Sequence, residues 1–270
     1  MLTYHLADVY LGRTAVQVPT AEVVGDPLLW LRAMAAHGVT HSWAPNFGFK
    51  LVVQADKAGA ARGIDLSRVQ KLMNAGEQVT SEVCDAFLLA TGLEPSVVQP
   101  AFGMAEVCTC MTYNNAYTPL AAGAAASALA ILKSSLHDDV LQLAGGGVAA
   151  GEVARFVDLG PPSPGVEIRI AAPADGTAVL GERQVGRLQI RGPCVMGGYH
   201  NHPKANAEAF EAGGGWFDSG DLGLLQSQSR SALLPVHVQR TAHRSSRCTV
   251  RAVQASSTTG GCTSPAAPRR

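Results

Sequence analysis

Residues 99–106 combine three groups that could hold a planar ligand and a cation. The segment follows a short predicted strand and contains Phe102, Gly103 and Glu106 within five residues. An aromatic ring offers a stacking face, a glycine permits close approach of the backbone, and a carboxylate is the hard oxygen ligand that Mg²⁺ prefers. A phenylalanine packed in a core beside a solvated glutamate would give the same pattern, so this segment alone leaves both interpretations open.

Two other segments carry groups suited to the same kind of ligand. Asp221 follows Ser-Gly in residues 215–223, where an ionised carboxylate in a turn can accept two hydrogen bonds from a diol such as that of ribose. In residues 74–77, Ala75, Gly76 and Glu77 follow a possible strand, and a small residue and a glycine let the backbone approach a planar molecule. Taken singly, each segment could also be an ordinary turn.

A fourth segment, residues 42–48, reads as a strand that ends at Pro45 and is followed by Asn46 and Phe47. Such a strand end, with a polar residue and an aromatic after it, could form one wall of an apolar pocket. An ordinary strand-to-loop corner is the alternative interpretation.

The order and spacing of these four segments resemble the adenylate-forming, or AMP-binding, superfamily. That superfamily includes acyl-CoA synthetases, luciferase-like enzymes and the adenylation domains of peptide synthetases. Residues 185–193, 196–199 and 202–205 extend the likeness, which covers about residues 6–224. Residues 44–47, together with Ala105 in the run Gly-Met-Ala-Glu, resemble the fatty acyl-AMP ligase branch, whose members occur alone and as loading modules of polyketide synthases.

The resemblance implies a role for each matching residue. Phe102 would stack on adenine and Asp221 would hold the ribose hydroxyls. Glu106 would be the catalytic residue that binds Mg²⁺ at the phosphates. The remaining implied positions are Ala75, Gly76, Glu77, Gly103 and Met104 around the nucleotide, and Asn46, Phe47 and Gly103 around the acyl group.

The implied function is ATP-dependent activation of a fatty or other carboxylic acid as acyl-AMP. The acyl group would then pass to the thiol of an acyl-carrier protein or of CoA. The resemblance also implies a phosphate-binding loop before Leu6 and a mobile domain with a catalytic lysine after Gly223, and neither is recognised in this sequence. We therefore expect a middle part of the large domain, with little activity by itself. An inactive remnant with no enzymatic role is the alternative hypothesis.

Local signals predict the elements that must position these residues. Asp26-Pro27 begins a helix that Gly38 ends, a strand follows over residues 39–44, and a second helix begins at Thr80 or Ser81 and ends before Gly92. Alternating strands and helices predict a layered α/β fold. We assign residues 1–165 to the α/β part of an AMP-binding domain, 166–225 to a β-rich subdomain with strands over 166–171 and 185–191, and 226–270 to a disordered tail.

Composition favours an ordinary globular protein with one sizeable core. The chain has 270 residues, is 47% hydrophobic and has no net charge, but seven arginines and no Asp, Glu or Lys fall in residues 226–270. An acidic body of about −7 thus carries a basic tail of about +7. We expect no nucleic-acid partner, because the tail lacks interleaved aromatics. Residues 118–151 suggest a helix and a flexible loop.

The sequence shows no apolar run long enough for a membrane span and no signal peptide. We therefore expect a cytoplasmic protein with reduced thiols. Cys108 and Cys110 form a Cys-x-Cys pair, for which two thiols on one strand face is the preferred interpretation over a metal site. His200 and His202 are likewise expected to be surface residues.

Overall fold

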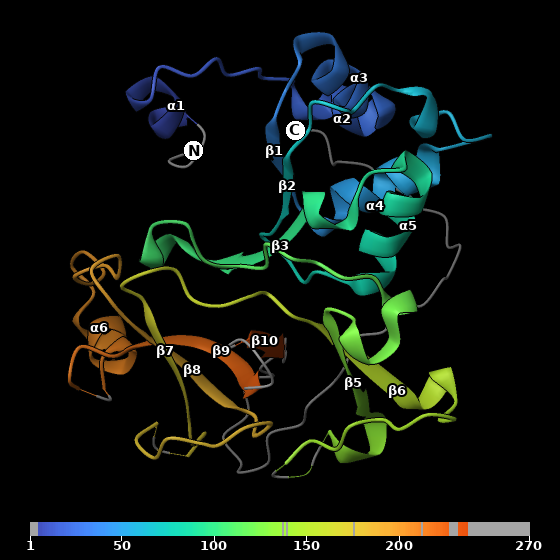
Figure 1. Cartoon of the computed structure of the whole chain (residues 1–270). Coiled ribbons are helices and arrows are strands. Elements are labelled where there is room, and N and C mark those ends of the chain that lie inside the picture. Colours follow the sequence, from blue (N-terminus) through green and yellow to red (C-terminus); the bar gives the residue numbers. More distant parts are fainter. Residues whose placement is uncertain are drawn as a thin grey trace, which may run out of the picture.

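The computed structural model arranges the chain as helices around three β-sheets (Figure 1). It describes residues 5–136, 138, 140–174, 176–211, 213–226 and 232–236, without the side chains of residues 124, 125 and 232–236. The α-helices are α1 (Ala7–Tyr10), α2 (Thr20–Gly25), α3 (Leu28–His37), α4 (Asn46–Ala55), α5 (Ser81–Thr91) and α6 (Pro203–Ala209). The 3₁₀ helices are η2 (Ala61–Gly63), η3 (Pro95–Val97), η4 (Ala105–Val107), η5 (Leu120–Ala125), η6 (Lys133–Ser135) and η7 (Ala150–Glu152). The strands are β1 (His41–Ala44), β2 (Lys71–Asn74), β3 (Val98–Gly103), β4 (Cys110–Tyr113), β5 (Ala128–Leu132), β6 (Val153–Val157), β7 (Glu167–Ala171), β8 (Gly186–Arg191), β9 (Phe217–Gln226) and β10 (Ala232–Val236).

The first sheet has the strand order β1-β2-β3-β4. β1 pairs with β2 and β2 with β3 in parallel, whereas β4 pairs with β3 antiparallel. Parallel neighbours need a crossover connection, and α4 and α5 lie in the two crossovers. Ala44 is paired with Asn74, and Asn74 with Pro100, so the three parallel strands reach a common level at their carboxyl ends.

An aromatic cluster packs α3, α4 and α5 together beside this sheet. The ring centroids of Trp30 and Phe49 are 5.4 Å apart and those of Phe49 and Phe87 are 4.8 Å apart, both in edge-on geometry. Phe49 and Phe87 are completely buried. The Trp30 indole N–H also donates a hydrogen bond of 3.0 Å to Ser42 Oγ, which links α3 to β1. Each edge-on ring pair adds about 0.5–1.5 kcal/mol beyond the burial of apolar area.

The helix boundaries at α3 and α5 confirm the sequence signals. Pro27 precedes α3, and Gly38, in the left-handed conformation with φ of 59°, ends it. Thr80 is extended immediately before α5, and Gly92 with φ of 72° follows that helix. A glycine at this position avoids the steric cost that a Cβ has in the left-handed region, so both helices end where the sequence predicts.

The second sheet is antiparallel throughout, with the order β10-β9-β8-β7, and β5 and β6 form a separate antiparallel pair. These strands and α6 lie in the lower half of Figure 1, below β1–β3 and α2–α5. β7 and β8 confirm the strands predicted between residues 166 and 191. The fold is therefore α/β with a β-rich part, while the proposed boundaries at residues 165 and 225 stay predictions.

The alanine-rich stretch of residues 118–151 does not form the predicted helix. η5 is interrupted at Gly123, and β5 then pairs along its length with β6. Alanine favours helix, but the pairing buries Ile131 completely, and such tertiary burial outweighs intrinsic propensity. Helix α4 was not predicted from the sequence. It begins at Asn46, and Pro45 alone separates it from the end of β1.

The segment 226–270, predicted to be disordered, contains a described strand. β10 pairs antiparallel with β9, from Ala232 opposite Gln226 to Val236 opposite Leu222, and this corrects the prediction for residues 226 and 232–236. Ala-Leu-Leu-Pro-Val is an apolar run within a polar, arginine-rich sequence, and β9 offers it a sheet edge to pair with. Residues 227–231 and 237–270 lie outside the described part, so the prediction is not tested there.

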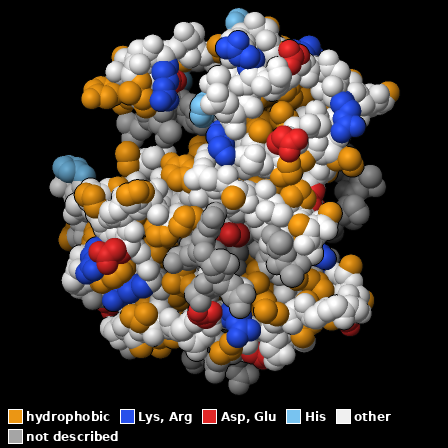
Figure 2. Space-filling view, in the orientation of Figure 1, with side chains coloured by type: hydrophobic (Ala, Val, Ile, Leu, Met, Phe, Trp, Pro, Cys, Tyr) orange, Lys and Arg blue, Asp and Glu red, His pale blue; other side chains and the backbone are white. Residues whose placement is uncertain are grey.

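Charged side chains of both signs are interspersed among apolar and neutral ones on the face in Figure 2. Within the described ranges, no helix is both long and apolar enough to cross a lipid bilayer.

We expect replacement of Gly103 by alanine to destabilise the fold. β3 and β4 approach so closely here that a Cβ would lie 2.1 Å from the carbonyl oxygen of Thr109 and 2.2 Å from the Cα of Cys110. The backbone would have to move, and overpacking of this kind costs about 1–3 kcal/mol. Chemical denaturation should detect this loss for Gly103→Ala but not for Gly63→Ala, where nothing lies within 4 Å of the added Cβ. Equal stability of the two variants would contradict the close approach.

Candidate functional site

One cavity collects residues from three of the four segments singled out in the sequence. Its volume is about 150 Å³. The walls come from the β2–α5 connection, the end of β3, the end of β6 with the residues after it, and β9. The lining residues are Gly76, Glu77, Gln78, Val79, Ala101, Phe102, Gly103, Phe156, Val157, Leu159 and Asp221. The fold therefore brings five of the predicted site residues to one place.

The β2–α5 connection presents its backbone to this cavity at Gly76. Gly76 has φ of 92°, a conformation that other residues rarely adopt, and a Cβ there would meet nothing within 4 Å. The backbone geometry thus requires glycine and leaves open space beside it. Ala75 is buried and does not line the cavity, and its N–H lies 3.4 Å from the carbonyl oxygen of Ala44. Ala75 therefore supports the connection from the sheet side.

Glu77 joins the cavity wall to the start of α4. Its carboxylate accepts a hydrogen bond from the backbone N–H of Phe47, in the first turn of that helix. A negative charge is favourable at a helix N-terminus. Phe47 itself is 46% exposed, and neither Phe47 nor Asn46 lines the cavity. Two of the three residues predicted for the acyl pocket, Asn46 and Phe47, therefore lie beside the cavity, whereas Gly103 lines it.

Asn46 instead braces the connection that carries Gly76. Its Oδ1 accepts hydrogen bonds from Asn74 Nδ2 at 3.2 Å and from the Thr80 N–H at 3.3 Å. Its Nδ2 donates to Thr80 Oγ1 at 3.3 Å. Asn74 also donates to the Sγ of Cys84, where burial raises the pKa of the thiol to about 12 and keeps it neutral. Asn46 thus holds both ends of the segment 74–80.

The end of β3 supplies an aromatic ring and a glycine. Phe102 is half-buried between the core beneath the first sheet and the core beneath the second, and it lines the cavity. Gly103 also lines the cavity, but its lack of a Cβ is required by the approach of β4. Glycine is therefore required at this position by the packing of the protein itself, not by a ligand.

Asp221 contributes a carboxylate from the opposite part of the fold. It lies in β9, is half-buried, and lines the same cavity as Gly76 and Phe102. Its backbone N–H donates a hydrogen bond of 3.1 Å to Ser219 Oγ. An aromatic face, an open stretch of backbone and a carboxylate thus surround one volume, which suits a purine joined to a diol.

Glu106 and Met104 lie next to the cavity without lining it. Glu106 is on η4, and its Oε1 accepts a hydrogen bond of 3.0 Å from the Tyr199 hydroxyl. The carbonyl oxygen of Glu106 accepts a second bond, of 2.8 Å, from the Met196 N–H. Partial burial and then the bond to Glu106 raise the pKa of Tyr199, so the phenol stays a donor. Met104 packs in the core of the second sheet.

Two parts of this site were missed by sequence reasoning. Phe156, Val157 and Leu159 form an apolar wall, yet a short, mostly apolar strand and the residues after it carry no chemical signature. Tyr199 belongs to a segment that supports the family resemblance, but only the fold reveals that it reaches Glu106. In the described part of the chain, no three or more His, Cys, Asp or Glu residues are grouped as a metal site.

The chain belongs to the AMP-binding enzyme family, whose sequence profile matches residues 2–200. It is similar to atromentin synthetase of Tapinella panuoides, with 31% identity over 235 residues. The match covers 84% of this chain and 21% of that protein, so the chain spans about one fifth of the length of its curated relative.

Solved structures place the fold among adenylation domains. The adenylation domain of a keto acid-selecting non-ribosomal peptide synthetase module, bound to keto acyl adenylate, is 32% identical with a TM-score of 0.77. That match covers 86% of this chain and 41% of the solved chain. The fatty acyl-adenylate ligase of Legionella pneumophila, in complex with acyl adenylate and pyrophosphate, is 24% identical with a TM-score of 0.74. This match covers 87% of this chain and 40% of the solved chain.

These comparisons confirm the superfamily and the fold predicted from the sequence. Of these three proteins, the two above 30% identity are a synthetase and a peptide-synthetase adenylation domain, whereas the fatty acyl-adenylate ligase shares the fold alone. The assignment to the fatty acyl branch therefore stays a prediction.

We expect Asn46→Ala to destabilise the protein by removing the brace of segment 74–80. Asn74 Nδ2 and the Thr80 N–H would lose their shared acceptor, and an unsatisfied buried donor costs about 1–3 kcal/mol. Chemical denaturation should detect this loss, with Gln54→Ala on the exposed side of α4 as the control. A residue that only borders a substrate pocket could be truncated without this cost, so unchanged stability would contradict the bracing role.

Proposed function

We propose that the cavity binds the adenosine part of ATP and of an acyl adenylate. The observation that carries this proposal is the convergence of Gly76, Phe102 and Asp221, from three segments far apart in the sequence, on one cavity. Phe102 supplies a ring face for adenine, and base–aromatic stacking contributes about 1–3 kcal/mol. Gly76 leaves space beside the backbone, and Asp221 supplies a carboxylate for two ribose hydroxyls. Membership of the AMP-binding enzyme family supports this assignment.

Glu106 is the residue that we propose to hold Mg²⁺ at the phosphates. One carboxylate suits this ion, because Mg²⁺ keeps several waters and takes other ligands from phosphate oxygens. The hydrogen bond from Tyr199 fixes one carboxylate oxygen of Glu106 and leaves the other for the ion. A bound Mg²⁺ supplies neutralisation of the charge that grows on a pyrophosphate leaving group.

For the whole protein we propose ATP-dependent activation of a carboxylic acid as an acyl adenylate, followed by transfer to the thiol of a carrier protein or of CoA. A keto acid is the first substrate class to consider, because the 32% identical adenylation domain binds a keto acyl adenylate. The fatty-acid hypothesis from residues 44–47 has support from the fold alone. A competition experiment between a keto-acyl adenylate and a long-chain acyl adenylate distinguishes the two substrate classes, because the chain should bind the adenylate of its own class more tightly.

We expect the purified chain to bind AMP and the Asp221→Asn variant to bind it at least about tenfold more weakly. Hydrogen bonds to a charged group contribute about 1.5–3 kcal/mol, and asparagine keeps the shape while removing the charge. Isothermal titration calorimetry measures the affinities. The matched control is Glu94→Gln, which neutralises an exposed carboxylate outside the cavity.

Phe102→Tyr, which keeps the ring face, should bind AMP like the unaltered chain, whereas Phe102→Leu should bind weakly. If the unaltered chain bound no AMP, the hypothesis of an inactive remnant would replace this proposal. Equal AMP affinity in Asp221→Asn and Glu94→Gln would remove Asp221 from the site.

A further inference from the structure

The strand that carries Asp221 is irregular at the point where it meets the cavity. Opposite β8, Gln189 pairs with Asp218 and Arg187 pairs with Leu222, so the register shifts between these two pairs. Three residues of β9, Ser219 to Asp221, therefore face a single residue of β8. Bulges of this kind bend a strand and re-aim its side chains, and they are common beside active sites.

Side chains of the bulge itself close this irregularity. Ser219 Oγ donates a hydrogen bond of 2.9 Å to the carbonyl oxygen of Leu188, the β8 residue that the register shift leaves without a ladder partner in β9. The Asp221 N–H donates to Ser219 Oγ at 3.1 Å. The Gly220 N–H donates to Asp218 Oδ1 at 2.9 Å, and Gly220 takes a positive φ of 77°. Asp218 and Ser219 thus fix the backbone on which Asp221 stands.

Asp218 is a buried charge with a dedicated partner. Its side chain is 5% exposed, and its Oδ2 lies 2.5 Å from Nε of Arg187, whose side chain is 17% exposed. A buried carboxylate without such a partner is costly, because neither water nor a cation compensates its charge. The ion pair therefore holds Asp218 in the position where its other oxygen, Oδ1, binds the Gly220 N–H.

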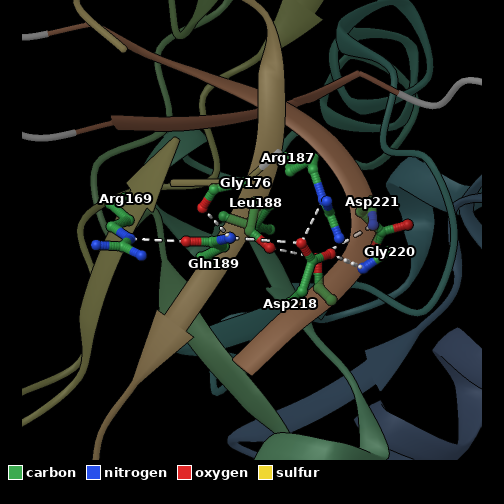
Figure 3. A network of polar contacts seen from close by, with 9 residues as sticks. Arg169, Gly176, Arg187, Leu188, Gln189, Asp218, Gly220 and Asp221 are labelled. Atoms are coloured by element: carbon green, nitrogen blue, oxygen red, sulfur yellow. Dashed lines mark hydrogen bonds and ion pairs between the residues drawn. The ribbon is translucent and has the colours of Figure 1, made fainter. Parts of the chain in front are cut away.

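The network continues from this ion pair across β8 to β7 (Figure 3). Gln189 Nε2 lies 3.5 Å from Asp218 Oδ2 and donates to the carbonyl oxygen of Gly176 at 2.8 Å. Gln189 Oε1 accepts a hydrogen bond of 2.7 Å from Arg169 Nε. The orientation of Asp218 is thus set by a chain of polar contacts that begins outside the cavity.

We propose that Asp218, clamped by Arg187, is a positioning residue that aims the Asp221 carboxylate into the cavity. This inference rests on the proposed function, since the group it aims at is the ribose of a bound nucleotide. Asp218 does not line the cavity and would touch no ligand. It acts through the bulge: its loss would free Gly220 and let Asp221 take other orientations.

The test uses a variant that separates this role from a purely structural one. Arg187→Met combined with Asp218→Leu replaces the buried ion pair by apolar side chains, a change that is often neutral or stabilising in proteins. It also removes the acceptor for the Gly220 N–H. Asp218→Asn is the second variant, which keeps the shape and an acceptor for the Gly220 N–H but leaves Arg187 without its anionic partner. Arg155→Met, which removes a more exposed ion pair with Glu82, is the control.

The first measurement compares calorimetric affinities for AMP and 2′,3′-dideoxy-AMP. We expect the unaltered chain and Arg155→Met to prefer AMP at least about tenfold, because only AMP offers both hydroxyls to the carboxylate. In the two variants of the Asp218–Arg187 pair, called the ion-pair variants, this preference should fall to about threefold or less. Their affinity for dideoxy-AMP should stay the same. A folded ion-pair variant that keeps the full preference would overturn the inference.

The second measurement does not depend on nucleotide binding. Hydrogen–deuterium exchange at the Gly220 and Asp221 amides should accelerate in both ion-pair variants relative to Arg155→Met, at equal global stability. Unchanged exchange would overturn the positioning role even if AMP binds. Accelerated exchange in a chain that binds no AMP would support the role of Asp218 in the bulge and reject the proposed nucleotide function, so the two failures are distinguishable.

Discussion

The parallel register of β1, β2 and β3 is the constraint on which the site depends. Because Ala44, Asn74 and Pro100 are paired in line, the residues that follow the three strands emerge side by side at one edge of the sheet. Ligands of open parallel sheets bind at the carboxyl ends of the strands for this reason. A cavity lined by Gly76 and Phe102 therefore follows from the register, and Asn46 and Glu77 tie the emerging segments to one another.

The β-rich part of the chain completes the cavity because it is joined to the same edge. Phe102 packs against both cores, and Val107 and Met111 lie in one core with Ile190 and Phe217 of the second sheet. Tyr199 and the Met196 N–H both bind Glu106. These contacts hold β9 where its bulge can present a carboxylate opposite the loops of the first sheet, so each part of the fold supplies a component that the other lacks.

The sequence was sufficient to predict features that local chemistry determines. The glycines Gly38 and Gly92 marked the ends of two helices, and the glycine, aromatic and carboxylate at Gly76, Phe102 and Asp221 were singled out from residue type and lie around one cavity in the fold. Features that depend on tertiary partners were not predictable. β5 overrides the helix propensity of its alanines by pairing with β6, and the partner of Glu106 lies 93 residues away. The sequence placed Asn46 at a pocket wall. Its side chain instead contacts Asn74 and Thr80, and only the tertiary structure reveals these partners.

A crystal structure of the chain grown with AMP tests the central claim, that these loops and the bulge form one nucleotide site. The account predicts adenine against the ring of Phe102, with the ribose hydroxyls within hydrogen-bond distance of the Asp221 carboxylate and the Asp218–Arg187 pair intact. Nucleotide bound elsewhere on the surface, or bound here with its ribose turned away from Asp221, would contradict it.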